Sequence, residues 1–205
     1  MNKKCLLIID IQNDFCPEGS LEVPNGDEII PVINKISPNF FKVVATQDWH
    51  PINHVSFAST HNKNPGDVIN INGIEQILWP DHCVQSSKGA NFHEYFYLNH
   101  VNIIIKKGAN PEIDSYSAFF ENDKKTETGL EYYLKGLKIT DAYICGLATD
   151  YCVYYSALDA KRLGFNTYVI IDASKGIDKP AGNLEKSIKD MKSKGINIIE
   201  HAQLL

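Results

Sequence analysis

Short segments that are apolar throughout and rich in β-branched residues constrain the fold of this 205-residue chain most strongly. Strands with helices on both faces show this continuous pattern, whereas half-exposed strands alternate apolar and polar side chains. Six such segments are predicted to be strands. Most of them are apolar throughout, as expected of strands that are covered on both faces. The six segments are residues 5–10, 42–47, 101–106, 142–145, 167–171 and 196–199.

Longer amphipathic segments between these strands predict helices. They cover residues 26–37, 128–137, 149–164 and about 183–194. The third begins at Thr149 and Asp150, which are both good helix-capping residues, and ends at Gly164. Because strands alternate with helices, we expect residues 1–205 to form one α/β domain. Its predicted architecture is a three-layer sandwich with a mainly parallel sheet of about six strands.

Composition and charge exclude several classes of protein. The formal net charge of −5 provides no basic surface for nucleic acid or anionic lipid. The first apolar run breaks at Asp10, too early for a signal peptide, and no run approaches the roughly 20 apolar residues of a membrane span. The five cysteines are scattered without a CxxC pair, which argues against a disulfide framework. We expect a cytoplasmic protein with no nucleic-acid or membrane partner.

Reactive side chains follow four successive predicted strands. Parallel α/β sheets bind ligands at the carboxyl ends of their strands, so these side chains are expected to meet at one rim. They are Asp10 after the first strand, Asp48 and His50 after the second, Lys106 and Lys107 at the third, and Cys152 after the fourth. Each alone is a common structural residue, but together they predict a catalytic centre.

Cys152 lies in the first turn of a predicted helix. The helix dipole and the free amides there stabilise negative charge, which lowers the pKa of a thiol and favours the thiolate. Asp10 has the chemistry of a general base, and a nearby lysine would supply a balancing positive charge. Only one of Lys106 and Lys107 can face the site, since side chains alternate along a strand. The alternative for Cys152 is a structural role on the inner face of its helix.

Asp48 and His50 are two residues apart at a strand end and can project to the same side. With one further imidazole they would form an oxygen–nitrogen–nitrogen site for a divalent transition metal. His82 and His54 are the candidates for that third ligand. We expect Zn at this site, with Fe and Mn as alternatives, because all three metals accept such ligands.

The stretch from residue 49 to about residue 99 is rich in Asn, Pro, His and Gly and has weak periodicity. Long irregular stretches in compact domains are often functional. This one carries both candidate histidines and Trp79. Together with Phe15 and Tyr116 on other loops, Trp79 would give flat walls for a small aromatic ring. The alternative for these aromatic residues is ordinary packing.

Several motifs resemble, in the same order, those of the nicotinamidase family within the isochorismatase-like hydrolases. They are residues 10–15 (DIQNDF), 48–51 (DWHP) with His54 and residues 56–57, 79–84 (WPDHCV), 107–108 (KG), 114–119 (DSYSAF) and 146–153 (GLATDYCV). The similarity covers about residues 5–175. Unlinked motifs rarely recur in one order by chance, so the resemblance is specific. It implies an isochorismatase-like fold.

The resemblance also implies roles for the rim residues. The implied catalytic triad is Asp10, Lys107 and Cys152, and Lys107 matches because it directly precedes a glycine. The implied metal ligands are Asp48, His50 and His82. His54 matches a histidine that binds metal in only some relatives.

Further roles concern the substrate. The implied ring-binding residues are Phe15, Trp79 and Tyr116, and the implied oxyanion hole consists of the backbone amides of Ala148 and Cys152. Relatives have a cis peptide before the residue that matches Ala148. We therefore expect a cis bond between Leu147 and Ala148.

The implied activity is hydrolysis of nicotinamide to nicotinate and ammonia through a thioester on Cys152, with a metal ion positioning the pyridine ring, in NAD salvage. Pyrazinamide is expected to be accepted as well, since aromatic walls discriminate weakly between small rings. Three alternatives remain open: an amidase for another small amide, a hydrolase whose nucleophile is a metal-bound water, and a catalytically silent relative that binds a metal or ligand. The sequence is compatible with a monomer or a homo-oligomer.

Overall fold

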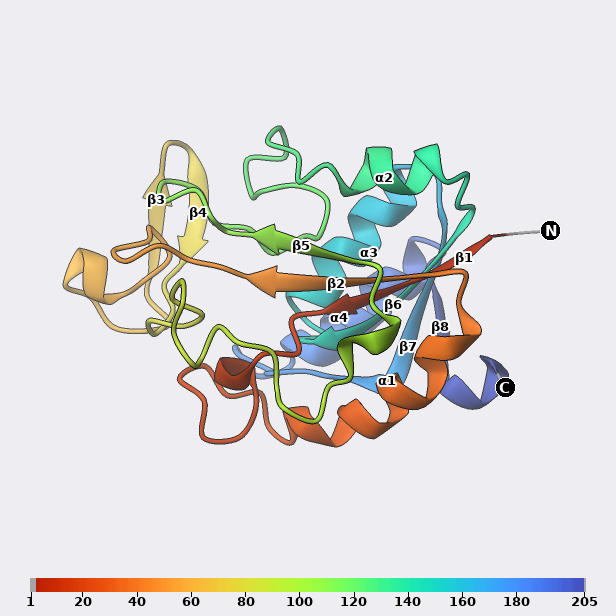
Figure 1. The fold of residues 1–205 in the computed structure, drawn as a ribbon. Helices are drawn as coiled ribbons and strands as arrows, with labels where there is room; N and C mark the ends of the chain where they lie inside the picture. Colours follow the sequence, from red (N-terminus) through yellow and green to blue (C-terminus); the bar gives the residue numbers. More distant parts are fainter. Residues whose placement is uncertain (1–2, 205) are drawn as a thin grey trace.

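The computed structural model of the protein describes residues 3–204. In this part of the chain, a parallel six-stranded sheet in the order β5-β2-β1-β6-β7-β8 runs through the centre of the molecule (Figure 1). Its strands are β1 (Lys4–Ile9), β2 (Lys42–Asp48), β5 (Ile103–Lys107), β6 (Asp141–Leu147), β7 (Asn166–Lys175) and β8 (Asn197–Ile199). All six predicted strands are confirmed. The central strands β1 and β6 are buried almost throughout, as their unbroken apolar sequences require.

Helices cover both faces of this sheet. The α-helices of the described residues are α1 (Ile30–Ile36), α2 (Leu130–Gly136), α3 (Cys152–Arg162) and α4 (Asn183–Ser193). Helix α3 packs on β6, β7 and α4. The β1–α1–β2 and β6–α3–β7 crossovers run in opposite directions across the sheet, so their usual right-handedness places α1 on the face opposite α3 (Figure 1). The predicted three-layer α/β architecture is therefore confirmed.

Short 3₁₀ helices complete the described structure. They are η1 (Asn13–Phe15), η2 (Gly26–Ile29), η3 (Ser37–Asn39), η4 (Ser59–His61), η5 (Leu98–His100) and η6 (His201–Leu204). The first predicted helix is thus a 3₁₀ turn followed by α1 rather than one continuous helix. Among residues 3–204, no helix combines the length and the apolar character that crossing a membrane requires.

The start of α3 differs from the prediction. The helix begins at Cys152, and Tyr151 occupies the position before it without a side-chain cap. Thr149 and Asp150 therefore lie outside the helix, and their predicted capping role is wrong. The Asp150 carboxylate instead accepts hydrogen bonds from the backbone amides of Ile177 and Asp178, at 3.0 and 2.9 Å. Asp150 thus stabilises the loop at residues 177–178 instead of the helix, a contact that the sequence pattern does not reveal.

An antiparallel hairpin interrupts the stretch that weak periodicity marked as irregular. It consists of β3 (Val68–Ile71) and β4 (Ile74–Ile77), which project to one side of the main sheet (Figure 1). Asn72 and Gly73 form its turn, both with positive φ angles, of 52° and 86°. An Asn-Gly pair between short β-branched runs is a strong signal for this kind of two-residue turn. The hairpin could therefore have been predicted from the sequence.

Candidate active site

Lys107 connects the acid and the thiol that the sequence predicted to meet. It is the last residue of β5, while Asp10 directly follows β1 and Cys152 begins α3. The Lys107 ammonium nitrogen Nζ lies 2.9 Å from Asp10 Oδ2 and 3.5 Å from Cys152 Sγ. It also donates to the backbone carbonyl oxygen of Ser115 at 3.0 Å. The structure thus brings Asp10, Lys107 and Cys152 together at the carboxyl rim of the sheet.

Lys107 also joins this group to the candidate metal ligands. Its Nζ lies 2.8 Å from Oδ1 of Asp48, which is its partner in the β2–β5 register. Burial alone would lower the pKa of Lys107, but the Asp10 and Asp48 carboxylates raise that pKa well above its usual value. Lys107 is therefore a permanent cation between two buried carboxylates.

The acid and the thiol both hold their protons more tightly than in water. Burial raises the pKa of Asp10, and the opposing charge of Lys107 does not cancel this effect. Burial likewise raises the pKa of the Cys152 thiol well above its usual value, against the charge of Lys107, and the negative charge of Asp10 adds to the increase. The predicted lowering of the thiol pKa by the helix dipole is therefore wrong for the resting protein, because desolvation outweighs it.

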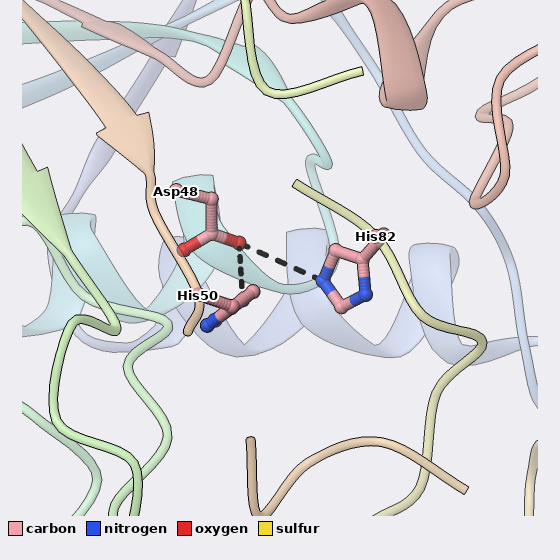
Figure 2. A group of neighbouring side chains, drawn as sticks. All are labelled: Asp48, His50 and His82. Atoms are coloured by element: carbon pink, nitrogen blue, oxygen red, sulfur yellow. Dashed lines mark ion pairs between the residues drawn. The ribbon is translucent and has the colours of Figure 1, made fainter. Parts of the chain in front are cut away.

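Asp48, His50 and His82 form a buried cluster whose ligand atoms lie within 4.8 Å of one another (Figure 2). The Asp48 oxygen Oδ2 lies 3.3 Å from His50 Nε2 and 3.8 Å from His82 Nε2. Burial alone would raise the pKa of Asp48, but Lys107 and His50 hold it well below its usual range. The carboxylate is therefore ionised, as a metal ligand must be.

The hydrogen bonds of His50 and His82 occupy Nδ1 and leave Nε2 available to bind a metal. His50 Nδ1 donates to the carbonyl oxygen of Gly108 at 2.9 Å, and His82 Nδ1 donates to that of Pro80 at 2.7 Å. Such bonds fix the tautomer of a metal-binding imidazole and direct Nε2 to the ion. His50 Nε2 is buried without a hydrogen-bond partner among residues 3–204, which a metal ion would remedy. These three residues fit a divalent transition metal.

His54 is engaged in other contacts. Its Nδ1 lies 2.8 Å from Ser56 Oγ, and its Nε2 lies 3.3 Å from the carbonyl oxygen of Ile113. Its ring centroid lies 4.2 Å from that of His50, and it belongs to a second group with His50 and Asp114 rather than to the Asp48 cluster. Burial lowers the pKa of His54 to about 4. His54 thus lies beside His50, but both of its nitrogens have protein partners and it is not part of the Asp48 cluster.

A pocket lies between the thiol and the metal cluster. Its lining includes the reactive residues Asp48, His82 and Cys152 and the predicted aromatic residues Phe15, Trp79 and Tyr116. Trp79 Nε1 donates to the Tyr116 hydroxyl at 3.0 Å, which fixes two of these walls relative to each other. The sequence prediction missed further lining residues, namely Leu21, Val23, Asp114, Tyr151 and Ile177. Tyr151 had a visible signal, because it directly precedes the candidate nucleophile.

The predicted oxyanion residues also border this pocket. Ala148 and Cys152 both contribute to its lining, on the turn between β6 and α3. The Leu147–Ala148 peptide bond is cis, as expected from the resemblance. The two backbone amides are therefore placed on the side of the pocket that holds the thiol.

Comparison with known proteins agrees with the geometry. Residues 4–203 match the model of the isochorismatase domain. A nicotinamidase of Acinetobacter baylyi is 46% identical over 205 residues, which cover 100% of this chain and 95% of that protein. The chain belongs to the isochorismatase-like hydrolases, among the nicotinamidases.

Solved structures of family members share the whole fold. A nicotinamidase-pyrazinamidase of Acinetobacter baumanii superimposes with a TM-score of 0.97 at 46% identity, covering 100% of this chain and 99% of that chain. The L. infantum PnC1 protein, solved with nicotinate, has a TM-score of 0.86 at 35% identity, with 98% and 94% covered. A pyrazinamidase of Pyrococcus horikoshii, solved with zinc, has a TM-score of 0.80 at 38% identity, with 97% and 99% covered.

Proposed function

We propose that this protein is a cysteine amidohydrolase that converts nicotinamide to nicotinate and ammonia. The observation that carries the proposal is the position of Lys107 Nζ, within 2.9 Å of Asp10, 2.8 Å of Asp48 and 3.5 Å of Cys152. Cys152, Asp48 and His82 line one aromatic pocket, which supports their assignment as a nucleophile and metal ligands, with Asp10 beside them as the proton acceptor. The full-length similarity to nicotinamidases supports the same substrate.

Proton transfer between Asp10 and Cys152 begins the proposed mechanism. Asp10 takes the thiol proton, and the sulfur attacks the amide carbon. The backbone amides of Ala148 and Cys152 stabilise the resulting oxyanion. Asp10 then returns the proton to the departing ammonia, which leaves a thioester on Cys152. Water hydrolyses this thioester, with Asp10 again as the base.

Lys107 makes these proton transfers feasible at neutral pH. Its positive charge opposes the burial of Asp10 and Cys152, so the negative charge can move from the carboxylate to the sulfur without a change in the total charge of the pocket. Both groups have raised pKa values for the same physical reason, which is desolvation. The charge of Lys107 lowers both pKa values against this effect, so it stabilises the carboxylate before the transfer and the thiolate after it.

A divalent metal held by Asp48, His50 and His82 would supply a Lewis acid that positions the pyridine nitrogen of the substrate. We expect Zn, with Fe or Mn as alternatives. The chain's own contribution is to fix the ligands through Gly108, Pro80 and Lys107. Phe15, Trp79 and Tyr116 would confine the ring, and pyrazinamide should also be accepted.

We further propose that the whole chain acts as one domain in the cytoplasm, in NAD salvage. One chain supplies each group named in this mechanism, so the chemistry does not require a partner subunit. The oligomeric state can therefore be a monomer or a homo-oligomer without a change in the proposed site.

The test is ammonia release from nicotinamide by the purified protein loaded with zinc. Release that disappears in Cys152→Ala and falls after EDTA treatment is the expected result. Full activity in Cys152→Ala, with complete loss after EDTA, would instead favour a metal-bound water as the nucleophile. Nicotinamide binding without ammonia release would indicate a catalytically silent relative. Ammonia release from other small amides, but not from nicotinamide, would indicate an amidase with a different substrate.

A further inference from the structure

The side chain of Thr46 makes two hydrogen bonds to Asp10, and the mechanism above assigns it no part. Thr46 lies on β2 and is fully buried. Its hydroxyl donates to Asp10 Oδ1 at 2.6 Å and accepts the backbone N–H of Asp10 at 3.1 Å. A hydroxyl has one proton to donate, and a backbone amide can only donate, so the direction of both bonds is fixed. The hydroxyl therefore holds the main chain and the carboxylate of one residue together.

The local backbone explains why Asp10 needs this partner. Strand β1 ends at Ile9, and the last register pair of β1 with β2 joins Ile8 to Ala45. Asp10 then turns out of the sheet with a φ of 50°, in the left-handed region that residues other than glycine rarely adopt. Its N–H leaves the regular pairing of the sheet, and the Thr46 hydroxyl replaces the lost partner.

The same two bonds fix the direction of the Asp10 carboxylate. Oδ1 accepts from Thr46, while Oδ2 lies 2.9 Å from Lys107 Nζ. Each oxygen is thus held from a different strand of the sheet, because Thr46 is on β2 and Lys107 is on β5. Without the hydroxyl, the carboxylate could rotate about its side chain toward Lys107 and away from the sulfur. Thr46 itself does not border the pocket.

We propose that Thr46 is a positioning residue that holds Asp10 in the orientation for proton exchange with Cys152. The proposal rests on the proposed function, because it assigns Thr46 a part in that reaction. It makes Thr46 important for turnover and not for substrate binding. Small errors in the placement of reacting groups can cost about 100-fold in rate. We therefore expect loss of the hydroxyl to lower kcat by about 10- to 100-fold and to change KM by less than about threefold.

A pair of variants isolates the hydroxyl from the rest of the side chain. Thr46→Ser and Thr46→Ala both lose the methyl group, but only Thr46→Ala loses the hydroxyl. Thr46→Val keeps the shape of the side chain and replaces the hydroxyl with a methyl group. Thr167→Val is the matched control, since Thr167 is equally buried on β7 and its hydroxyl bonds only to the carbonyl oxygen of Phe165 among the described residues.

The experiment measures kcat and KM for nicotinamide hydrolysis by the zinc-loaded proteins, together with zinc content and melting temperature. Wild type and Cys152→Ala in the same assay test the proposed function separately, since an inactive wild type would overturn that function first. The expected result is a low kcat in Thr46→Ala and Thr46→Val, and a kcat close to wild type in Thr46→Ser and Thr167→Val. Zinc content should be equal in all of them.

A second readout follows the thiol directly. Iodoacetamide forms a carbon–sulfur bond to Cys152 as iodide leaves and the thiol proton passes to Asp10, and mass spectrometry of the Cys152 peptide gives the rate. This rate should fall in Thr46→Ala and recover in Thr46→Ser. If Thr46→Ala is unfolded, Thr46→Val takes its place in the comparison. Equal kcat values and equal alkylation rates in the variants with and without the hydroxyl would overturn the proposal in an active enzyme.

Discussion

Two regions of the molecule contribute to the site, and they are built differently. The rim of the sheet presents Asp10, Lys107 and Cys152 from the ends of β1 and β5 and the start of α3. These positions follow from the regular register of parallel strands, as in the pairing of Asp48 with Lys107. The rim is therefore fixed by repeated backbone hydrogen bonds and by a continuous apolar core.

The segment between β2 and β5 contributes His82 and Trp79 without such regularity. It is tied to the rest of the site by individual bonds. Cys83 N–H donates to Asp14 Oδ2 at 2.7 Å, and its carbonyl oxygen accepts from His50 N–H at 3.0 Å. We propose that the rim carries the bond-breaking chemistry, whereas this segment carries a candidate metal ligand, His82, and the aromatic contacts of Trp79 that would position a substrate. Variants of the rim should therefore lose turnover, whereas variants of the segment between β2 and β5 should lose metal or substrate binding.

The largest effect is expected at the rim. Lys107→Met should lower kcat/KM by about 10³-fold, because Asp10, Asp48 and Cys152 lose the cation that they share. It should also destabilise the protein by about 3–5 kcal/mol, the usual cost of leaving a buried carboxylate unpaired. Steady-state kinetics and thermal melting measure both effects.

Lys106→Met is the matched control for that variant. Lys106 is the preceding residue of β5 and is exposed, with its Nζ 3.6 Å from the centre of the Trp49 ring. It should lose less than about threefold in kcat/KM, since surface interactions of this kind contribute about 1 kcal/mol or less. Similar losses in the two variants would mean that general damage to β5, and not the position of Lys107, accounts for the effect.

The next effect concerns His82, the proposed metal ligand on the segment between β2 and β5. His82→Ala should weaken zinc binding by at least about 100-fold, because even partners of metal ligands contribute 10- to 100-fold. Competition with a chromogenic chelator gives the affinity. Iodoacetamide should still alkylate Cys152, since the rim remains intact. His93→Ala, on the same segment but outside the cluster, should bind zinc normally. Unchanged zinc affinity in His82→Ala would remove this residue from the metal site.

A smaller effect is expected for the aromatic wall. Trp79→Leu should raise KM for nicotinamide by about 10-fold and lower kcat much less, because it removes a flat contact and the partner of the Tyr116 hydroxyl. Phe41→Leu, which changes a half-exposed aromatic residue outside the pocket, should leave both constants unchanged. A loss in kcat alone would show that Trp79 acts on the reaction and not on binding.

The smallest effect is a change in the pH dependence of stability near the site. Burial raises the pKa of Glu121 to about 7, and Asp123 and Asp114 add to the shift. A raised carboxyl pKa stabilises the fold fully below the pKa of the unfolded chain, and this contribution is lost as pH rises toward 7. Because Glu121 is partly exposed, we expect Glu121→Gln to gain only about 1 kcal/mol at pH 8 and nothing at pH 4.

Urea unfolding at the two pH values measures this difference. Glu112→Gln removes an exposed carboxylate from the same segment and should show no comparable gain. A gain that is equal at pH 4 and pH 8 would argue against ionisation of Glu121 as the cause.

The two regions also differ in how far the sequence predicts them. The strands, and the meeting of Asp10 and Cys152 with one of two adjacent lysines, follow from apolar runs and from the geometry of parallel sheets. The choice of Lys107 over Lys106 came from the family resemblance. The choice of His82 over His54 as the neighbour of Asp48 does not follow from local patterns. It depends on Asp14, 69 positions away in sequence from Cys83, and on the contacts that occupy His54.

Electrostatics and side-chain hydrogen bonds were the least predictable features. The position of Cys152 at a helix start indicated a lowered thiol pKa, yet burial reverses the direction. The hydroxyl of Thr46 gave no sequence signal, because a threonine inside a buried strand is ordinary. The burial of Cys152 and the bonds of Thr46 to Asp10 both depend on contacts between separate strands, which the pattern of residues along the sequence does not show.

The most direct test of the mechanism is to look for the acyl group on the nucleophile. The zinc-loaded protein is mixed with nicotinamide, quenched in acid during turnover, digested and examined by mass spectrometry. The expected result is a nicotinoyl group on the peptide that contains Cys152, formed and lost at rates consistent with turnover. Undiminished ammonia release by Cys152→Ala, with no acyl group on the wild-type peptide, would contradict the account.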